Sequence, residues 1–514
     1  MRSRTPKLLH PICGWPMIAW PVVAARAAGA SKIVVVDAPG EPLRAHLDDD
    51  VTVVVQEQPL GTGDALKAAA EHFGSSSVVV LYGDVPLIRS QSIVSLVRAH
   101  ERAREQPDEQ VRERAQERAH EQARDHADVA ATVLTAVPDD PSGYGRVVRD
   151  DQGCVLKVVE TKKPGDATEA ELLIREVNTG IYVFDAATLG GSLDQIRNEN
   201  AQGEYYLTDV LSILRGDGHS VGAFLLEDPL EMFNINDRRA LAAATGIAQR
   251  RINDVHMLAG ATLISPEATV IDADVVLGED VVIEPGTALH GYTTVGDGST
   301  IGPHTTLRDV TIGSNSKVIH SYATHVTIAD NVSVGPFSYL RPGTEMHDGS
   351  KAGAFVEIKN SEVGERSKVP HLSYIGDATI GEDSNIGAST ITGNYDGYEK
   401  HPTKIGARVH TSVDTTLIAP VTLGDDSYTG AGSVITDNVP EGALAIARPR
   451  QTNIDGYAAK TRLRQAADGT GRGAGGTGQG ADGTGRGADG TGRGTDGTGQ
   501  AGAETSDVDH TEAD

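Results

Sequence analysis

The stretch T-T-V-G-D-G-S-T-I-G at residues 293–302 places an aliphatic residue followed by glycine twice, six positions apart. Because strand side chains alternate between two faces, a period of six returns the aliphatic residue to the same side. The repeat predicts a β-solenoid from about Leu263 to Ile446 with one continuous aliphatic core. Further pairs, in which an aliphatic residue or once a threonine precedes a small residue, stand at Leu277-Gly278, Ile328-Ala329, Val334-Gly335, Ile380-Gly381, Ile386-Gly387, Leu423-Gly424 and Thr429-Gly430.

The first part of the chain has a different rhythm, because Val/Ile-rich runs alternate with Ala-rich helical stretches. The runs lie at residues 33–36, 51–55, 78–81 and 129–137. This alternation predicts βαβ units, and therefore an α/β domain built on a parallel sheet.

The same patterns divide the chain into expected domains. We expect an α/β domain over residues 1–238, a linker helix over 239–260 and the solenoid over 261–456. A tail rich in Gly, Thr and Asp, residues 457–514, is expected to be disordered. Segment 98–126 has almost no aliphatic residues and is expected to be an exposed helix or a disordered insertion.

Charge and cysteine content limit the classes of function. The formal net charge is −27, which disfavours binding to nucleic acid or to an anionic membrane surface. Two cysteines in 514 residues rule out a disulfide framework and favour a reducing compartment. No uncharged apolar run approaches the roughly 20 residues of a membrane helix. These features predict a cytoplasmic protein that acts on small molecules.

Ordered polar motifs add a specific resemblance. The solenoid contains L-R-P-G at 340–343, F-V-E-I-K at 355–359 and H-L-S-Y-I-G-D at 371–377, and the first part contains Q-E-Q-P-L-G-T-G at 56–63 and Y-G-D-V-P-L at 82–87. From Pro6 to about Gly456 the chain resembles the bacterial bifunctional N-acetylglucosamine-1-phosphate uridyltransferase / glucosamine-1-phosphate N-acetyltransferase family. The resemblance implies a Rossmann-like nucleotidyltransferase domain followed by a left-handed parallel β-helix, assembled as a homotrimer with acetyltransferase sites shared between subunits.

The resemblance implies roles for residues of the solenoid. His371 matches the catalytic base, and a histidine with an ordinary pKa near 6.5 can take the proton of an attacking amine. Arg341 and Lys359 match the cations that grip the substrate phosphate, while Tyr374 and Asn385 match residues that hold the sugar. The residues implied along the acetyl-CoA path are Ala388, Asn394, Tyr395, Val413, Ala431 and Arg448. Val413 departs from the family, which has serine there.

Roles in the first part follow in the same way. Asp84 and Asn236 match the ligands of Mg²⁺, a cation that prefers carboxylate and amide oxygens. Asp64 departs from the family's usual histidine. The residues implied in binding the UDP-sugar are Lys7, Gln56, Gly61, Thr62, Tyr82, Gly83, Gly145, Glu160, Asn178 and Asn236.

The start of the chain also departs from the family, whose members open with a strand and a loop L-A-A-G-x-G-T-R-M before the motif S-R-T-P-K, here at residues 3–7. Glycines of such a loop let backbone N–H groups approach nucleotide phosphates, so their loss should remove uridylyl transfer. Two interpretations compete: a start assigned at an internal Met, or a shortened chain. The first is favoured because the other motifs are intact, and translation upstream of Met1 tests it.

Three hypotheses of function follow. The first is acetylation of glucosamine 1-phosphate by acetyl-CoA, followed by transfer from UTP to give pyrophosphate and UDP-N-acetylglucosamine, a precursor of peptidoglycan. The second is acetylation alone, because the phosphate loop is absent. The third is a non-catalytic hexapeptide-repeat scaffold, against which the joint presence of His371, Arg341, Lys359 and Asn385 argues.

The role of His371 generates a first prediction. His371→Ala should lower the rate of acetyl transfer by about 10²–10⁴-fold, the usual contribution of a general base. Assembly should not change, because one imidazole contributes little to a stacked aliphatic core. A thiol-release assay with acetyl-CoA and size-exclusion chromatography measure the two effects, and unchanged acetylation kinetics would refute the role.

Overall fold

The computed structural model describes residues 1–105, 129–161, 167–198 and 203–469. Of the expected insertion, residues 98–105 belong to a helix, α3 (Ser90–Glu105), and the remainder lies outside the described residues. The chain divides into two units, Met1–Arg448 and Pro449–Asp514. The domain boundaries expected from the sequence stay predictions.

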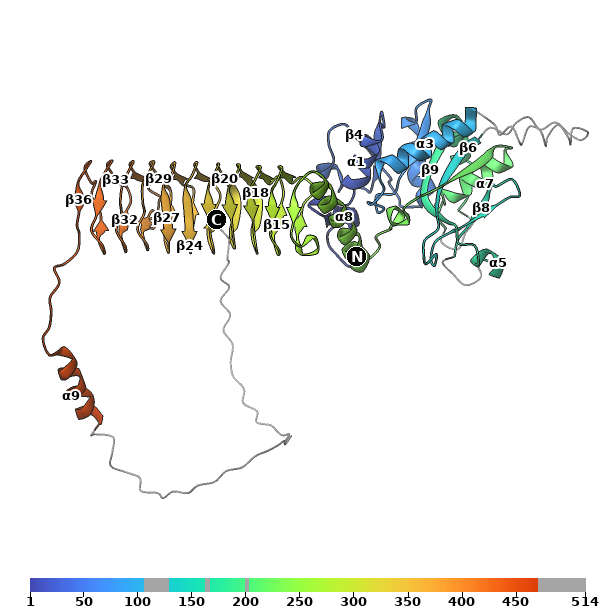
Figure 1. Cartoon of the computed structure of the whole chain (residues 1–514). Helices are drawn as coiled ribbons and strands as arrows, with labels where there is room; N and C mark the ends of the chain where they lie inside the picture. Colours follow the sequence, from blue (N-terminus) through green and yellow to red (C-terminus); the bar gives the residue numbers. More distant parts are fainter. Residues whose placement is uncertain (106–128, 162–166, 199–202, 470–514) are drawn as a thin grey trace, which may run out of the picture. The chain divides into compact units, whose positions relative to one another are not determined.

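The N-terminal domain is built on a mixed sheet with the strand order β10-β6-β9-β7-β8, and β5 pairs with β9 (Figure 1). A separate parallel pair, β3 and β4, and a short antiparallel pair, β1 and β2, complete the described strands of this domain. The strands are β1 (Pro11–Ile12), β2 (Trp15–Pro16), β3 (Ile33–Asp37), β4 (Val51–Val55), β5 (Ser77–Val80), β6 (Val129–Ala136), β7 (Arg146–Arg149), β8 (Val155–Val159), β9 (Val177–Asp185) and β10 (Ser220–Leu225). The helices are η1 (Lys7–Leu9), α1 (Ala19–Ala27), η2 (Arg44–His46), α2 (Thr62–Ala68), η3 (Ala70–His72), α3, α5 (Glu169–Leu172), α6 (Ala186–Leu193), α7 (Thr208–Gly216), η4 (Pro229–Met232) and α8 (Arg238–Leu258).

The main sheet differs from the parallel sheet that the alternating runs predict. Strand β9 is antiparallel to β5, β6 and β7, whereas β10 and β6 are parallel. All but one of the residues of β9 are buried, with Tyr182 and Phe184 fully enclosed. Burial on both faces shows that a strand is central in a sheet, but it does not encode the direction in which the strand runs.

The second domain is a parallel β-helix whose coils stack so that each short strand pairs with its counterparts in neighbouring coils (Figure 1). The strands line three faces of the coil. The first face consists of β11 (Thr262–Leu263), β14 (Val282–Ile283), β17 (Thr300–Ile301), β19 (Lys317–Val318), β21 (Ser333–Val334), β24 (Lys351–Ala354), β27 (Lys368–His371), β34 (Tyr428–Thr429) and β36 (Leu444–Ala445). The second consists of β12 (Val270–Ile271), β15 (Ala288–His290), β18 (Thr306–Ile312), β20 (Tyr322–Ile328), β22 (Tyr339–Leu340), β25 (Glu357–Lys359), β28 (Tyr374–Gly376), β30 (Ile391–Gly393), β32 (Thr416–Ile418) and β35 (Val434–Ile435). The third consists of β13 (Val276–Leu277), β16 (Thr294–Val295), the ends of β18 and β20, β23 (Thr344–Met346), β26 (Glu362–Val363), β29 (Ala378–Ile380), β31 (Thr403–Ile405) and β33 (Val421–Leu423).

The predicted aliphatic stacking is present inside the coils. On the second face Leu307, Ala323, Leu340, Ile358 and Ile375 are register partners in successive coils, and all are fully buried. The sequence period of six thus produces a continuous core, as strand alternation requires.

Buried hydroxyl groups satisfy the backbone where the coils turn. The Oγ of Ser316 donates to the carbonyl of Ala329 at 2.8 Å and accepts from the N–H of Val332 at 3.0 Å. Ser384 makes the same pair of contacts with Gly406 and Val409. A turn between strands leaves backbone groups without ladder partners, and these hydroxyls supply the missing hydrogen bonds inside the coil.

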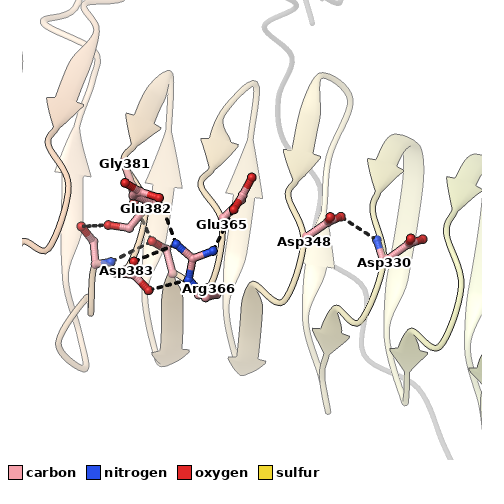
Figure 2. Close-up of polar contacts among 9 residues, drawn as sticks. Asp330, Asp348, Glu365, Arg366, Gly381, Glu382 and Asp383 are labelled. Carbon is pink, nitrogen blue, oxygen red and sulfur yellow. Dashed lines mark hydrogen bonds and ion pairs between the residues drawn. The ribbon is translucent and has the colours of Figure 1, made fainter.

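Charged residues link the outer corners of successive coils. Figure 2 shows Arg366 between the carboxylates of Glu365, Glu382 and Asp383, with N–O distances of 2.8–2.9 Å. These carboxylates raise the pKa of Arg366. The groups are exposed, so water screens the attraction and the ion pairs add little to stability.

Helix α8 joins the domains and packs on the first coils. Its N-terminus is capped by Asp237, whose carboxylate accepts from two backbone N–H groups at 2.8 Å. At the other end Gln249 and Asn253 donate to the carbonyls of Ile271 and Pro266 at 2.9 and 2.8 Å. Trp15 also donates to Asp274 at 2.6 Å, so the hairpin β1–β2 contacts the β-helix as well.

Beyond the β-helix, residues 457–469 form helix α9 (Tyr457–Gly469), and residues 470–514 of the expected tail lie outside the described residues. The sequence of α9 contains Ala, Lys, Arg, Leu and Gln, which are strong helix formers. Among the helices that the structure describes, none combines the length and apolar character needed to cross a bilayer.

Candidate active sites

Three predicted residues from distant segments meet in the N-terminal domain. Lys7 lies on η1, Asp84 follows β5, and Asn236 precedes α8. The Lys7 ammonium donates to Asp84 Oδ2 at 2.5 Å and to Asn236 Oδ1 at 2.8 Å. A backbone hydrogen bond of 3.0 Å from the N–H of Ile235 to the carbonyl of Asp84 holds the two oxygen-bearing segments together.

The oxygens of this cluster suit a small divalent cation. Asp84 Oδ2 and Asn236 Oδ1 converge on one point, since both lie within hydrogen-bond distance of the Lys7 nitrogen. One carboxylate and one amide oxygen, completed by water and phosphate, match the way proteins hold Mg²⁺. No group of three or more His, Cys, Asp or Glu side chains placed for a metal ion occurs in the described ranges. Any cation here would therefore depend on its substrate for further ligands.

A tight loop carries the residues expected to contact the base. Gln56 directly follows β4, at the carboxyl end of a parallel strand, where α/β folds bind ligands. Gly61 has φ +118°, and a Cβ there would lie 2.6 Å from the carbonyl oxygen of Tyr205. The loop is fixed to Tyr205 by hydrogen bonds of 2.7 and 2.8 Å that involve Leu60 and Gly63.

Thr62 of this loop contacts Tyr82, which lies among other polar residues. Burial raises the pKa of Tyr82 to about 12, and its phenol is hydrogen-bonded to Thr62. The Tyr82 ring occupies the space that a Cβ on Gly180 would need. Glu160 lies close enough to raise the pKa of Tyr82 further.

The remaining sugar-binding candidates lie beside this group. Asn178 donates to the hydroxyl of Tyr182 at 2.7 Å, and its backbone N–H donates to the carbonyl of Gly145 at 2.9 Å. Gly83 packs against Leu8 and Ile18, and a Cβ there would lie 2.9–3.0 Å from their methyl groups. These contacts join Asn178 to Gly145, whereas Gly83 touches only apolar side chains, and the roles assigned to these residues stay predictions.

In the β-helix, four predicted residues form one column across successive coils. His371 ends β27, and its carbonyl accepts from the N–H of Ser389 at 3.2 Å, which sets Ala388 beside it in the next coil. Equivalent bonds from Asp414 to Ala388 (2.8 Å) and from Gly432 to Val413 (2.9 Å) extend the register. His371, Ala388, Val413 and Ala431 therefore follow one another along the coil axis, and we call them the base column. His371 is exposed, and Val413 is 48% exposed.

A cluster of cations lies at the far edge of the second face. Arg341 and Lys359 occupy equivalent positions after register partners Leu340 and Ile358. Glu357 holds the Arg341 guanidinium at 2.9 Å and raises its pKa. The pKa of Lys359 is lowered, chiefly because the Lys400 ammonium lies next to it. Like charges held together in this way favour an anionic ligand.

Lys400 was missed by the sequence analysis. It belongs to an external loop, residues 394–402, in which Tyr395 pairs with Lys400 and the N–H of His401 donates to the carbonyl of Asn394 at 2.8 Å. Asp396 accepts from the N–H groups of Tyr398 and Glu399, both at 2.8 Å, and closes the turn. The available signal was a lysine three residues after G-N-Y-D-G, but only the folded loop shows where it points.

The other predicted residues are spread around these two centres. The Asn394 amide donates to Asp377, and the Tyr374 hydroxyl lies with it above Gly376. Asn385 stands three residues before Ala388 in the same coil, which places it at the opposite end of the first face from the base column. Arg448 is exposed after β36.

Comparison with known families agrees with both halves. A family described as MobA-like NTP transferase domain matches residues 1–149, and one described as nucleotidyl transferase matches residues 106–229. The bacterial transferase hexapeptide family, as six repeats, matches residues 274–309. The fold and the three family matches together define a nucleotidyltransferase domain joined to a hexapeptide-repeat transferase domain.

Individual relatives extend the similarity over nearly the whole chain. The bifunctional protein GlmU of Corynebacterium efficiens is 42% identical over 477 residues, which cover 91% of this chain and 93% of that protein. GlmU of Paenarthrobacter aurescens is 44% identical over 472 residues, with 90% and 89% coverage, and that of Streptomyces coelicolor is 42% identical over 475 residues, with 91% and 93% coverage. The chain belongs to the GlmU family of bifunctional proteins.

The cation cluster generates a second prediction. Lys400→Met removes one of three positive charges, so glucosamine 1-phosphate should bind about tenfold more weakly. The pKa of Lys359 should rise toward its ordinary value at the same time. Isothermal titration calorimetry measures the affinity, and Lys404→Met, an exposed lysine in the next coil, serves as the control. An unchanged affinity in Lys400→Met would exclude Lys400 from the site.

Proposed function

We propose that this chain acetylates glucosamine 1-phosphate with acetyl-CoA and then joins the product to the uridylyl group of UTP, which yields UDP-N-acetylglucosamine and pyrophosphate. Identity of 42–44% to GlmU proteins across both domains is the observation that carries this conclusion. A scaffold would not need the convergence of Lys7, Asp84 and Asn236 on one point.

Acetyl transfer is assigned to the β-helix. The neutral amine of the sugar attacks the thioester carbonyl, the new C–N bond forms, and the C–S bond breaks. We assign to His371 the removal of the amine proton, which ends on the departing CoA thiolate. Arg341, Lys359 and Lys400 bind the sugar phosphate, and Tyr374 and Asn385 position the ring. The shared charge of the three cations compensates the phosphate dianion.

The base column supports an extended path for acetyl-CoA. Adjacent coils are about 4.8 Å apart, so the column from His371 to Ala431 spans roughly 14 Å along the axis. Small or apolar residues along this line leave room for the pantetheine arm. We place Asn394 and Tyr395 beside the arm and Arg448 at the phosphate end. Val413 offers no hydroxyl, so the coenzyme gains only apolar contact there.

Uridylyl transfer is assigned to the N-terminal domain. The sugar phosphate attacks the α-phosphorus of UTP and pyrophosphate leaves. Asp84 and Asn236 would hold Mg²⁺, which neutralises phosphate charge when bound. Lys7 contacts both of these residues and would pair with a phosphate. Gln56, Gly61 and Thr62 bind the uracil, whereas Tyr82, Gly83, Gly145, Glu160 and Asn178 line the sugar.

A homotrimer is supported by an apolar ladder beside the base column. His304, His320, Phe337 and Phe355 stack with ring centroids 5.3–5.4 Å apart, and Leu372 follows in the next coil. Phe337, Phe355 and Leu372 are 56–59% exposed in the single chain. Contiguous exposed apolar residues of this kind are typical of subunit interfaces. We infer that neighbouring subunits cover this ladder in a homotrimer and that a neighbour completes each acetyltransferase site.

The substrates also indicate the location of the protein. Acetyl-CoA and UTP are cytoplasmic metabolites, and the low cysteine content, two in 514 residues, favours a reducing compartment. We therefore assign the enzyme to the cytoplasm, with small molecules as its substrates.

Separate half-reaction assays test the proposed function. Asp84→Asn should lower uridylyl transfer by about 10²-fold or more, because a charged group at the phosphates is lost. Acetyl transfer should be unchanged, since the two sites lie in different domains. Pyrophosphate release and thiol release measure the two reactions on the full chain. Acetylation without any uridylyl transfer in the unmodified chain would favour the acetyltransferase-only hypothesis.

The ladder generates a prediction about assembly. Phe355→Glu places a charge on the apolar ladder and should convert the trimer to smaller species. Light scattering coupled to size-exclusion chromatography measures the mass. Tyr292→Glu, at a 75% exposed position away from the ladder, should leave assembly unchanged. A wild-type monomer, or a Phe355→Glu trimer, would contradict the assigned interface.

A further inference from the structure

The side-chain amide of Gln56 is held at one end by two acceptors. Its Nε2 donates to Asp64 Oδ2 at 2.7 Å and to the carbonyl of Gly61 at 3.3 Å. A carboxylate and a backbone carbonyl can only accept hydrogen bonds, so the nitrogen and not the oxygen must face them. The chemistry of the neighbours therefore fixes the orientation of this amide, independently of how its two ends are assigned.

Both acceptors belong to a rigid part of the domain. The Gly61 carbonyl is fixed because Leu60 and Gly63 are hydrogen-bonded to the backbone of Tyr205 at 2.7 and 2.8 Å. Asp64 lies in the first turn of α2, which starts at Thr62. Thr62 is itself held at 3.1 Å by the N–H of Leu207. The amide is thus oriented by groups that are themselves immobilised.

An amide fixed in this way presents Oε1 on the side away from Asp64. Oε1 can only accept, so it pairs with a base that carries a hydrogen on its ring nitrogen N3. Uracil has this N3–H, whereas N3 of cytosine is an acceptor and would face the oxygen with no hydrogen between them. The orientation of the Gln56 amide therefore decides whether uracil or cytosine forms the hydrogen bond.

We propose that Asp64 is a positioning residue that turns the Gln56 carbonyl toward the base, so that the nucleotide site selects uracil over cytosine. The inference rests on the proposed uridylyl transfer and adds the origin of its base selectivity. A histidine, the family's usual residue here, can donate or accept according to its tautomer. Asp64 has no such choice and fixes one orientation.

Asp64 has a competing structural role. An acidic residue in the first turn of a helix interacts favourably with the helix dipole, and Asp64 is such a residue in α2. That role would change the stability of the domain but would affect UTP and CTP equally. The ratio of the two affinities separates the roles.

Asp64→Asn provides the test, because asparagine has nearly the same shape but can donate to Gln56 Oε1. Only the longer contact with the Gly61 carbonyl, at 3.3 Å, then still requires Nε2 on that side, so the amide can turn and present Nε2 to the base. The wild-type chain should bind UTP more tightly than CTP in the presence of Mg²⁺, and this preference should fall about five- to tenfold in Asp64→Asn. Isothermal titration calorimetry with each nucleotide on the full chain gives the ratio.

Two further variants serve as controls. Asp64→Glu keeps an acceptor-only group and should retain most of the preference. Glu71→Gln removes one exposed negative charge from η3, which follows α2, and should leave the preference unchanged.

The possible outcomes are distinct. Retention of the wild-type preference in Asp64→Asn, with or without a lower thermal unfolding midpoint, would overturn the positioning role and leave the proposed function standing. Failure of the wild-type chain to bind UTP would overturn uridylyl transfer and this inference together. Binding of UTP and CTP with equal affinity by the wild-type chain would overturn the selectivity alone.

Discussion

The backbone hydrogen bonds between successive coils are the constraint on which the β-helix and its chemistry depend. They are parallel and in register, so a residue at one position of a coil lies directly beside its equivalent in the next. Leu340, Ile358 and Ile375 become a core row by this register, and His371, Ala388 and Val413 become an outer column by the same register. The same register therefore determines both which residues pack in the interior and which residues line up on the surface.

In the N-terminal domain, the candidate site residues are brought together in another way. Its candidate site residues come from loops that are fixed one to another by single backbone hydrogen bonds, such as those between Leu60, Gly63 and Tyr205. Lys7, Asp84 and Asn236 meet because η1, the segment after β5 and the start of α8 converge. Loops supported by a rigid sheet usually carry function in α/β domains.

The sequence predicted the β-helix well because its pattern is local and repeated. A single pair such as Val295-Gly296 marks one side of its own coil without reference to distant residues. Direction in the N-terminal sheet could not be predicted, since β9 is buried at all but one of its residues and pairs with strands that are distant in the chain. The motifs located most of the candidate site residues. Lys400 was not predicted, because it lies next to Lys359 only when the loop 394–402 folds back. The effect of Asp64 was equally hidden, since its contact with Gln56 depends on the turn between them.

The same external loop shows how such a repeat accommodates extra length. Ser367 bonds the backbone 17 residues ahead, at Ser384, whereas Ser384 makes the same contact 25 residues ahead, at Val409. The additional residues leave the coil at a corner and return to it, so the strands before and after keep their alignment. Because extra loop residues do not disturb the strands, the fold and the binding specificity can change independently. The coils keep their geometry when an outward loop changes its length or its charges. Such a change can alter which molecule is bound without breaking the backbone hydrogen bonds between coils.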